Sequence, residues 1–105
     1  MFTVIGTYTY VKELEKWDNA DRVAAGKIPE KLASNPFIGD SLNYPFLRER
    51  RVREKRVYYL IYEDLKLVLL VATSGKKDQQ ATIDHIKENL DEFRKVAEEV
   101  AKQVS

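Results

Sequence analysis

The residues of this chain that could do chemistry are basic, and they lie between Phe46 and Lys77. Arginines and lysines crowd the start of this stretch, and two apolar segments rich in aromatic and β-branched residues follow. The second apolar segment ends on Gly75, Lys76 and Lys77. A pair of strands would hold these cations rigidly, and rigid cations that face a groove can bind a phosphate backbone. We therefore expect a surface that binds a polyanion.

The charge is segregated along the chain although the net charge is only +1. Residues 1–43 carry 5 basic and 6 acidic groups, residues 44–77 carry 9 and 4, and residues 78–105 carry 4 and 7. The middle third is therefore net +5 between two acidic segments. Such a distribution favours one positive face, although a solvated charged face without function remains the alternative.

The composition indicates one compact domain. The chain has 105 residues, of which 44% are hydrophobic and 33% are charged, as in globular proteins of one core. It has no cysteine, which excludes disulfides and thiolate metal sites. The chain lacks a membrane-length apolar run and a signal-peptide pattern, so we expect a cytoplasmic protein that binds no membrane. There is no metal-spaced histidine cluster and no phosphate-binding glycine loop, so no cofactor or metal is expected.

The apolar pattern predicts a single α+β domain over residues 1–105, in the order β-α-α-β-β-β-α. We expect a mostly antiparallel twisted sheet of about four strands, two N-terminal helices and a long C-terminal helix. The predicted strands cover 3–10, 46–51, 56–62 and 66–73, with a tight turn near Arg53 and a loop at 37–45. The strand at 66–73 is apolar enough to be central and covered on both faces. The predicted N-terminal helices cover 11–25 and the segment from Pro29 to Asn35.

The C-terminal segment, at about 79–103, is the clearest helix. Its apolar residues recur at gaps of three and four: Ile83, Ile86, Leu90, Phe93, Ala97, Val100 and Val104. A helix with this pattern lies across a sheet, or its outer turns pack against a second copy of the chain. A homodimer through this helix is therefore the second interpretation.

Several short motifs occur in a recognisable order. Leu32, Asn35 and Pro36 are followed by a basic strand, by Arg56-Val57-x-Tyr59 and then by Gly75-Lys76-Lys77. In this order, over about residues 3–83, the chain resembles the RelE/ParE superfamily of toxins from bacterial and archaeal toxin–antitoxin pairs. RelE-type members cut messenger RNA on the ribosome and are held inactive by an antitoxin, whereas ParE-type members act on gyrase.

The resemblance implies roles for individual residues. It assigns the catalytic cations to Arg56 and to Lys77, or to Lys76 with a slip of one residue. It assigns RNA binding to Lys76 and to Arg48, Arg50 and Arg51, whose register is open. The family often has a tyrosine about six residues beyond the last basic residue, whereas this chain has Ile83 there. This departure concerns the cleavage step more than the fold.

Cleavage of RNA requires that a 2′-hydroxyl is deprotonated, that the phosphate charge is stabilised and that the 5′-oxygen receives a proton. Arginine and lysine can stabilise the charge, and a lysine crowded by other cations can also serve as the base. Tyr58 and Tyr62 should share the sheet face of Arg56, with Tyr59 on the other. Tyr58 could then stack on a base, or it could simply be a core residue. His85, the only histidine, should point to solvent from the last helix.

These observations lead to the hypothesis of a RelE-like, metal-independent endoribonuclease toxin that acts on ribosome-bound messenger RNA and binds a cognate antitoxin. A non-catalytic RNA- or antitoxin-binding module of the same fold is the alternative. A gyrase inhibitor like ParE is a third interpretation.

Overall fold

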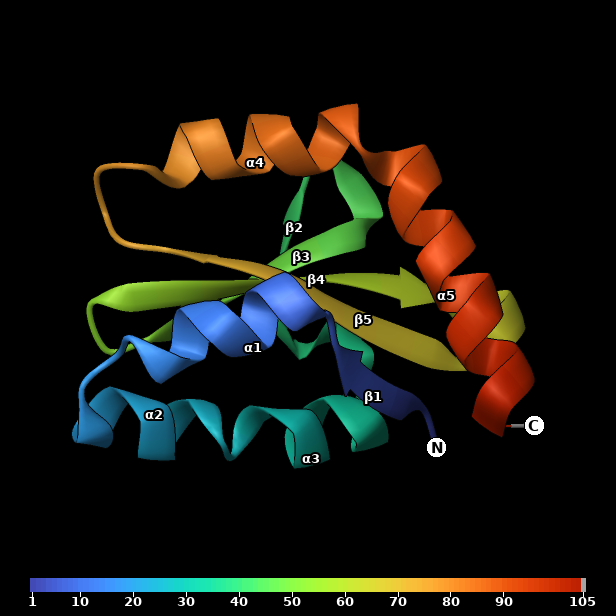
Figure 1. Ribbon diagram of the computed structural model, residues 1–105, viewed down its shortest axis with the longest axis horizontal. Helices are drawn as coiled ribbons and strands as arrows, with labels where there is room; N and C mark the ends of the chain where they lie inside the picture. The colour runs from blue at the N-terminus through green and yellow to red at the C-terminus, as the bar shows by residue number, and fades with distance from the viewer. Residues whose placement is uncertain (105) are drawn as a thin grey trace.

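The computed structural model describes residues 1–104 as one α+β unit around a five-stranded sheet (Figure 1). The strands lie in the order β1-β5-β4-β3-β2, with β1 parallel to β5 and all other neighbours antiparallel. In chain order the elements are β1 (Thr3–Gly6), α1 (Tyr8–Glu15), α2 (Asn19–Ala25), α3 (Ile28–Ser34), η1 (Pro36–Ile38), β2 (Asp40–Leu42), β3 (Tyr44–Val52), β4 (Lys55–Tyr62), η2 (Glu63–Leu65), β5 (Leu67–Ser74), α4 (Gln79–Glu88) and α5 (Leu90–Val104). The predicted α+β class is confirmed.

Helices cover both faces of the sheet. In Figure 1, α1, α2 and α3 lie on one side of it and α4 lies on the other, while α5 starts on the side of α4 and runs past one end of the sheet. The core of the first side consists mainly of Tyr10, Ala25, Ile28, Leu32, Val57, Tyr59, Ile61, Val68 and Leu70. The core of the second side consists mainly of Leu47, Tyr58, Leu60, Leu69, Val71, Ala72 and Ile86. Because β5 contributes to both cores and lies between β1 and β4, the prediction of a doubly covered central strand is confirmed.

The N-terminal segment differs from the prediction because polar side chains cap helices earlier than expected. The first strand ends at Gly6, since the Thr7 hydroxyl accepts a hydrogen bond from the Tyr10 amide (3.2 Å) and starts α1. The predicted helix over 11–25 is two helices, because the Asp18 carboxylate accepts from the Asp21 amide (2.9 Å) and starts α2. Threonine and aspartate are favoured N-caps since their oxygens satisfy amides that have no partner inside the helix.

The predicted single helix over 79–103 is also two helices. They are separated at Asn89, whose backbone leaves the helical region (φ −117°, ψ 20°) and whose side-chain amide donates to the His85 carbonyl (2.8 Å). The bend lets Ile86 of α4 and Phe93 of α5 pack into the same core, and in Figure 1 α5 turns away from the direction of α4. The predicted loop 37–45 contains one further short strand, β2, at the edge of the sheet.

The β3–β4 hairpin, which carries six of the nine basic residues of segment 44–77, is anchored to α2. Its turn lies at Arg53 and Glu54, as predicted, and Arg53 adopts a positive φ of 57°. The two-residue turns that usually close hairpins require positive φ, which is disfavoured for most residues other than glycine and asparagine. Arg53 is held there by an ion pair from its Nε to the buried Asp21 carboxylate (2.8 Å), which also binds the Lys55 amine. This anchor positions the end of the hairpin.

Candidate functional site

The basic residues of β3 are divided between the two faces of the sheet. In the hairpin register Glu49 lies opposite Tyr58, and Arg51 lies opposite Arg56. Residues directly opposite in an antiparallel pair point to the same face, and Tyr58 packs in the core under α4. Arg56 in turn lies opposite Ser74 of β5. We call these five residues, Glu49, Arg51, Arg56, Tyr58 and Ser74, the Arg56 face.

Arg56 is the central cation of this face. Its side chain is only 15% exposed, and its Nε lies 3.8 Å from the Glu49 carboxylate. When the Gln79 amide oxygen faces the guanidinium, it accepts from Arg56 Nε at 2.6 Å and from Nη2 at 3.0 Å. Arg56 is therefore held in place from two different elements, by an ion pair with Glu49 of β3 and by hydrogen bonds to Gln79 of α4. A cation fixed in this way is preorganised to meet developing negative charge.

Arg51 places a second guanidinium next to Arg56. Its Nε donates to the Arg53 carbonyl (2.9 Å), and its Nη2 is 4.0 Å from the exposed Glu54 carboxylate. Its side chain stays 59% exposed, so Arg51 is accessible to a ligand. Like charges directly opposite each other destabilise a strand pair. An anion bound between Arg51 and Arg56 would relieve that repulsion.

Lys76 and Lys77 lie at the same end of the sheet. The loop that carries them leaves β5 at Ser74, opposite Arg56, and returns to Arg56 at Gln79. Asp78 shapes this loop because its carboxylate accepts from the Gly75 amide (2.9 Å). Both lysines are exposed. The structure thus brings Lys76 and Lys77 to the end of the molecule where Arg51 and Arg56 lie.

Tyr58 lies on the Arg56 face but beneath the surface. It is completely buried, and its hydroxyl is 2.8 Å from the hydroxyl of Ser74. Burial raises the pKa of Tyr58 above the usual tyrosine value, against the opposing effect of the Ser74 hydrogen bond. The side chain has no free ring face for a base, so its position corresponds to the core interpretation rather than to RNA binding.

Arg48 and Arg50 lie on the opposite face of the sheet. They are paired in register with Tyr59 and Val57, which belong to the core under α1–α3. Arg48 donates to the backbone carbonyls of Pro45 (2.8 Å), Phe37 (3.2 Å) and Gly39 (2.8 Å), and Arg50 reaches that of Ile38 (3.4 Å). These two arginines, to which the resemblance assigned RNA binding, do not converge with Arg56, because the pleat sends alternate residues to opposite faces. They hold the η1 segment against β3.

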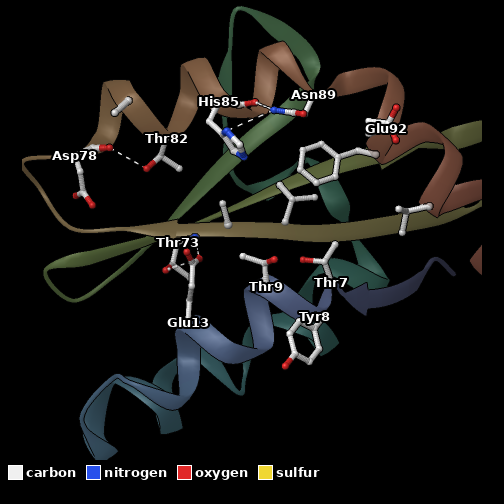
Figure 2. A pocket seen from close by; sticks show the side chains of 15 residues that line it. Thr7, Tyr8, Thr9, Glu13, Thr73, Asp78, Thr82, His85, Asn89 and Glu92 are labelled. Carbon is white, nitrogen blue, oxygen red and sulfur yellow. Dashed lines mark hydrogen bonds between the residues drawn. The ribbon is translucent and has the colours of Figure 1, made fainter.

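A separate cleft of about 730 Å³ opens between α1 and the helices α4 and α5, along the edge of β5 (Figure 2). In it the Glu13 carboxylate accepts from the amide (2.9 Å) and hydroxyl (3.1 Å) of Thr73. His85 lines the opposite wall, exposed as predicted, with its Nδ1 3.4 Å from the Asn89 amide. The charged side chains in the lining are acidic, apart from His85. This cleft is therefore chemically unlike the Arg56 face.

Ile83, which stands where the family often has a tyrosine, packs against the core under α4. Within residues 1–104, no group of three or more His, Cys, Asp or Glu side chains is arranged to hold a metal ion. Over the same residues, no helix combines the length and apolar character needed to cross a bilayer.

Sequence reasoning missed two polar residues of this site. Glu49 interrupts a basic run and was not assigned a role, yet its carboxylate is the acidic partner of Arg56. Gln79 opens α4 and contacts the same guanidinium. For Glu49, an available signal was its position two residues before Arg51, because residues i and i+2 of a strand share a face.

Comparisons with known proteins bear on the fold. No protein-family model matches the sequence, and no curated protein matches it significantly. Among solved structures, a free double mutant of E. coli RelE toxin superposes with a TM-score of 0.70 at 14% identity, over 83% of this chain and 96% of that one.

Two toxin–antitoxin complexes are also similar. For the intact E. coli RelBE complex the TM-score is 0.65 at 15% identity, over 73% of this chain and 99% of that one. For the Mycobacterium tuberculosis RelBE2 complex it is 0.63 at 20% identity, over 71% and 98%. The chain therefore has the fold of the RelE toxins.

Proposed function

We propose that this protein is the toxin of a toxin–antitoxin pair and a metal-independent endoribonuclease that cleaves messenger RNA on the ribosome. The observation that carries the proposal is the arrangement at one end of the sheet. Arg56 and Arg51 lie opposite each other, Glu49 lies beside Arg56, and the exposed lysine loop 75–78 lies at the same end.

The set of side chains matches the demands of phosphodiester cleavage. Arg56 and Lys77 would stabilise the charge that develops on the phosphate, and Arg51 and Lys76 would bind neighbouring phosphates. The bond from the 2′-oxygen to phosphorus forms while the bond from phosphorus to the 5′-oxygen breaks. This leaves a 2′,3′-cyclic phosphate and a free 5′-hydroxyl.

Glu49 is the best placed candidate for the general base. Its carboxylate is 3.8 Å from Arg56 Nε and 20% exposed, so a 2′-hydroxyl next to a phosphate held by Arg56 could reach it. An exposed lysine, Lys76 or Lys77, would supply the proton to the 5′-oxygen. The Glu49→Gln variant keeps the shape but removes the basicity, so cleavage should fall while RNA binding persists.

A cognate antitoxin is the expected protein partner. The solved RelBE complexes pair toxins of this fold with antitoxins, and an acidic protein would match the Arg56 face of this chain. Toxicity on expression should be relieved by co-expression of an antitoxin encoded next to the gene.

The test is primer-extension mapping of messenger cleavage in a purified translation system. The wild type should cut, and the double variant Arg56→Ala with Lys77→Ala should not. A matched double variant, Lys27→Ala with Lys31→Ala, removes two exposed cations on the far side of the sheet, one at the N-cap of α3 and one within that helix, and should cut normally. Equal cleavage by all three proteins would show that the site is misassigned.

Two observations favour the non-catalytic alternative. Ile83 replaces the tyrosine, and the Arg56 guanidinium is already bound by Glu49 and Gln79. A binding module of this kind would bind RNA or an antitoxin without cutting. Normal growth of a host that expresses the chain alone, together with intact messengers, would favour it over the nuclease.

A further inference from the structure

A second surface, away from the Arg56 face, presents exposed aromatic rings. Phe37 is 41% exposed, Tyr44 38% and Phe46 37%. The rings of Tyr44 and Phe46 stack with centroids 5.0 Å apart and planes at 10°. We call these three residues the aromatic patch. Large exposed aromatics that lie together are unusual on a protein surface that contacts only water.

The aromatic patch adjoins a hollow where β3 and β4 separate. Their pairing ends at Leu47 and Leu60, whereas β4 continues to Tyr62 along β5. The strand edge of β4 at Ile61 and Tyr62 is therefore left open on the side of β3. The resulting hollow has a volume of about 570 Å³ and is lined by Phe37, Pro45, Phe46, Ile61, Tyr62, Glu63, Asp64 and Arg94. Its walls are mostly apolar.

The cations near this hollow are already bound. Arg48 stacks over the Phe37 ring, 5.0 Å from its centroid, and donates to three backbone carbonyls. Arg94 forms two hydrogen bonds to Asp64, at 3.0 and 2.7 Å, and one to Glu98 at 3.1 Å.

The carboxylate of Glu63, in contrast, is exposed and has neither a hydrogen bond nor an ion pair within residues 1–104. The free charge at the rim is therefore negative.

We propose that the aromatic patch and the adjoining hollow form a docking surface for a protein segment that presents a large apolar side chain next to a lysine or arginine. The apolar side chain would fill the hollow against Phe46 and Tyr62, and the cation would pair with Glu63. In protein interfaces a few anchor residues that fill well-packed pockets carry most of the binding energy, and aromatic residues are enriched among them.

The charges distinguish this surface from the Arg56 face. RNA that stacked on the aromatic patch would bring phosphates next to the unpaired Glu63 carboxylate, and Arg48 and Arg94 are already bound to oxygen atoms of the chain itself. The aromatic patch and the Arg56 face therefore select opposite charges, and a partner at the aromatic patch would leave the cations of the Arg56 face free. The proposal does not depend on whether the chain cleaves RNA.

The experiment is a selection of phage-displayed random dodecapeptides on the immobilised wild type, followed by affinity measurements on purified variants. We expect enriched peptides with an aromatic or leucine residue beside a basic one. Phe46→Ser and Glu63→Lys should each lower the affinity of the protein for these peptides by about tenfold or more. The matched control Tyr8→Ser removes an aromatic ring of α1 that is 77% exposed and outside the aromatic patch, and it should bind normally.

Several results would overturn the proposal. These are the absence of any enriched sequence, an acidic consensus, or affinities that Glu63→Lys leaves unchanged. Amide shifts at the aromatic patch on titration with oligouridine would instead identify an RNA surface. A sedimentation shift to a dimer that Phe46→Ser abolishes would identify a contact between two copies. Because Glu63 is exposed, Glu63→Lys tests the proposal even if Phe46→Ser does not fold.

Discussion

The two faces of β3 carry the same kind of residue and use it differently. On one face Arg48 and Arg50 donate to backbone carbonyls of the η1 segment and its neighbours. On the other face Arg51 and Arg56 lie opposite each other, and the Arg51 side chain remains largely exposed. A cation that satisfies carbonyl groups of its own chain serves the fold, whereas paired cations with a vacant side can bind a ligand.

The comparison also shows what the acidic residue between them does. Glu49 shares the face of Arg51 and Arg56, not that of Arg48 and Arg50. It offsets part of the repulsion between the two arginines through its ion pair with Arg56. The face with the unbalanced positive charge therefore also carries the only carboxylate of β3.

The largest expected effect is on cleavage. Arg56→Ala should lower the rate of messenger cleavage by about 10²–10³-fold, because it removes a preorganised cation from the developing phosphate charge. The matched variant Arg48→Ala, assayed under conditions in which it is folded, should cleave at close to the wild-type rate. Primer extension over a time course measures both. If the two variants lose activity equally, the distinction between the faces fails.

The second effect is on stability, and here the variant of the Arg48 face should lose more than the variant of the Arg56 face. Arg48→Met should lower the free energy of unfolding by about 1.5–3 kcal/mol, since hydrogen bonds from a charged donor to carbonyls are lost. Arg51→Met should stay within about 0.5 kcal/mol of the wild type, because Arg51 is largely exposed. Urea denaturation followed by circular dichroism compares them. A larger loss of unfolding free energy for Arg51→Met would show that the structural role belongs to the face of Arg51 and not to that of Arg48.

A smaller effect concerns the lysine loop. Lys77→Ala should weaken RNA binding by about tenfold and make the slope of log affinity against log salt concentration shallower by about one, because one phosphate contact is lost. Lys31→Ala, on the far side of the sheet, should change neither quantity. Fluorescence anisotropy with a labelled oligoribonucleotide at several salt concentrations provides the measurement, and an unchanged slope would remove Lys77 from the site.

The smallest effect separates the buried layer of the Arg56 face from its surface. Tyr58→Phe should cost about 1 kcal/mol of stability through the lost bond to Ser74, and it should leave cleavage unchanged. Burial raises the pKa of Tyr58, so the folded protein keeps this proton after the unfolded chain has lost it. The corresponding stability is complete below about pH 10 and is lost as the pH rises above it. Denaturation measured between pH 8 and 11 should show that the free energy of unfolding falls less steeply with pH for Tyr58→Phe than for the wild type.

Much of the fold could be predicted from the sequence. The central strand, the β3–β4 hairpin with its turn at Arg53 and Glu54, and the covering helices follow from apolar periodicity. The early helix starts at Thr7 and Asp18 and the bend at Asn89 were missed. They depend on single polar side chains that bond to nearby backbone, and these bonds leave no mark in an apolar pattern.

The sequence by itself determined that Arg56 and Tyr58 share a face and that Tyr59 points to the other, because strand side chains alternate. It could not decide to which face the basic residues of β3 belong, since a shift of one residue in register exchanges all of them. Tertiary structure decided this by burying Leu47 under α4 and by anchoring the hairpin turn to Asp21. Those two constraints place Arg51 beside Arg56 and turn Arg48 away from it.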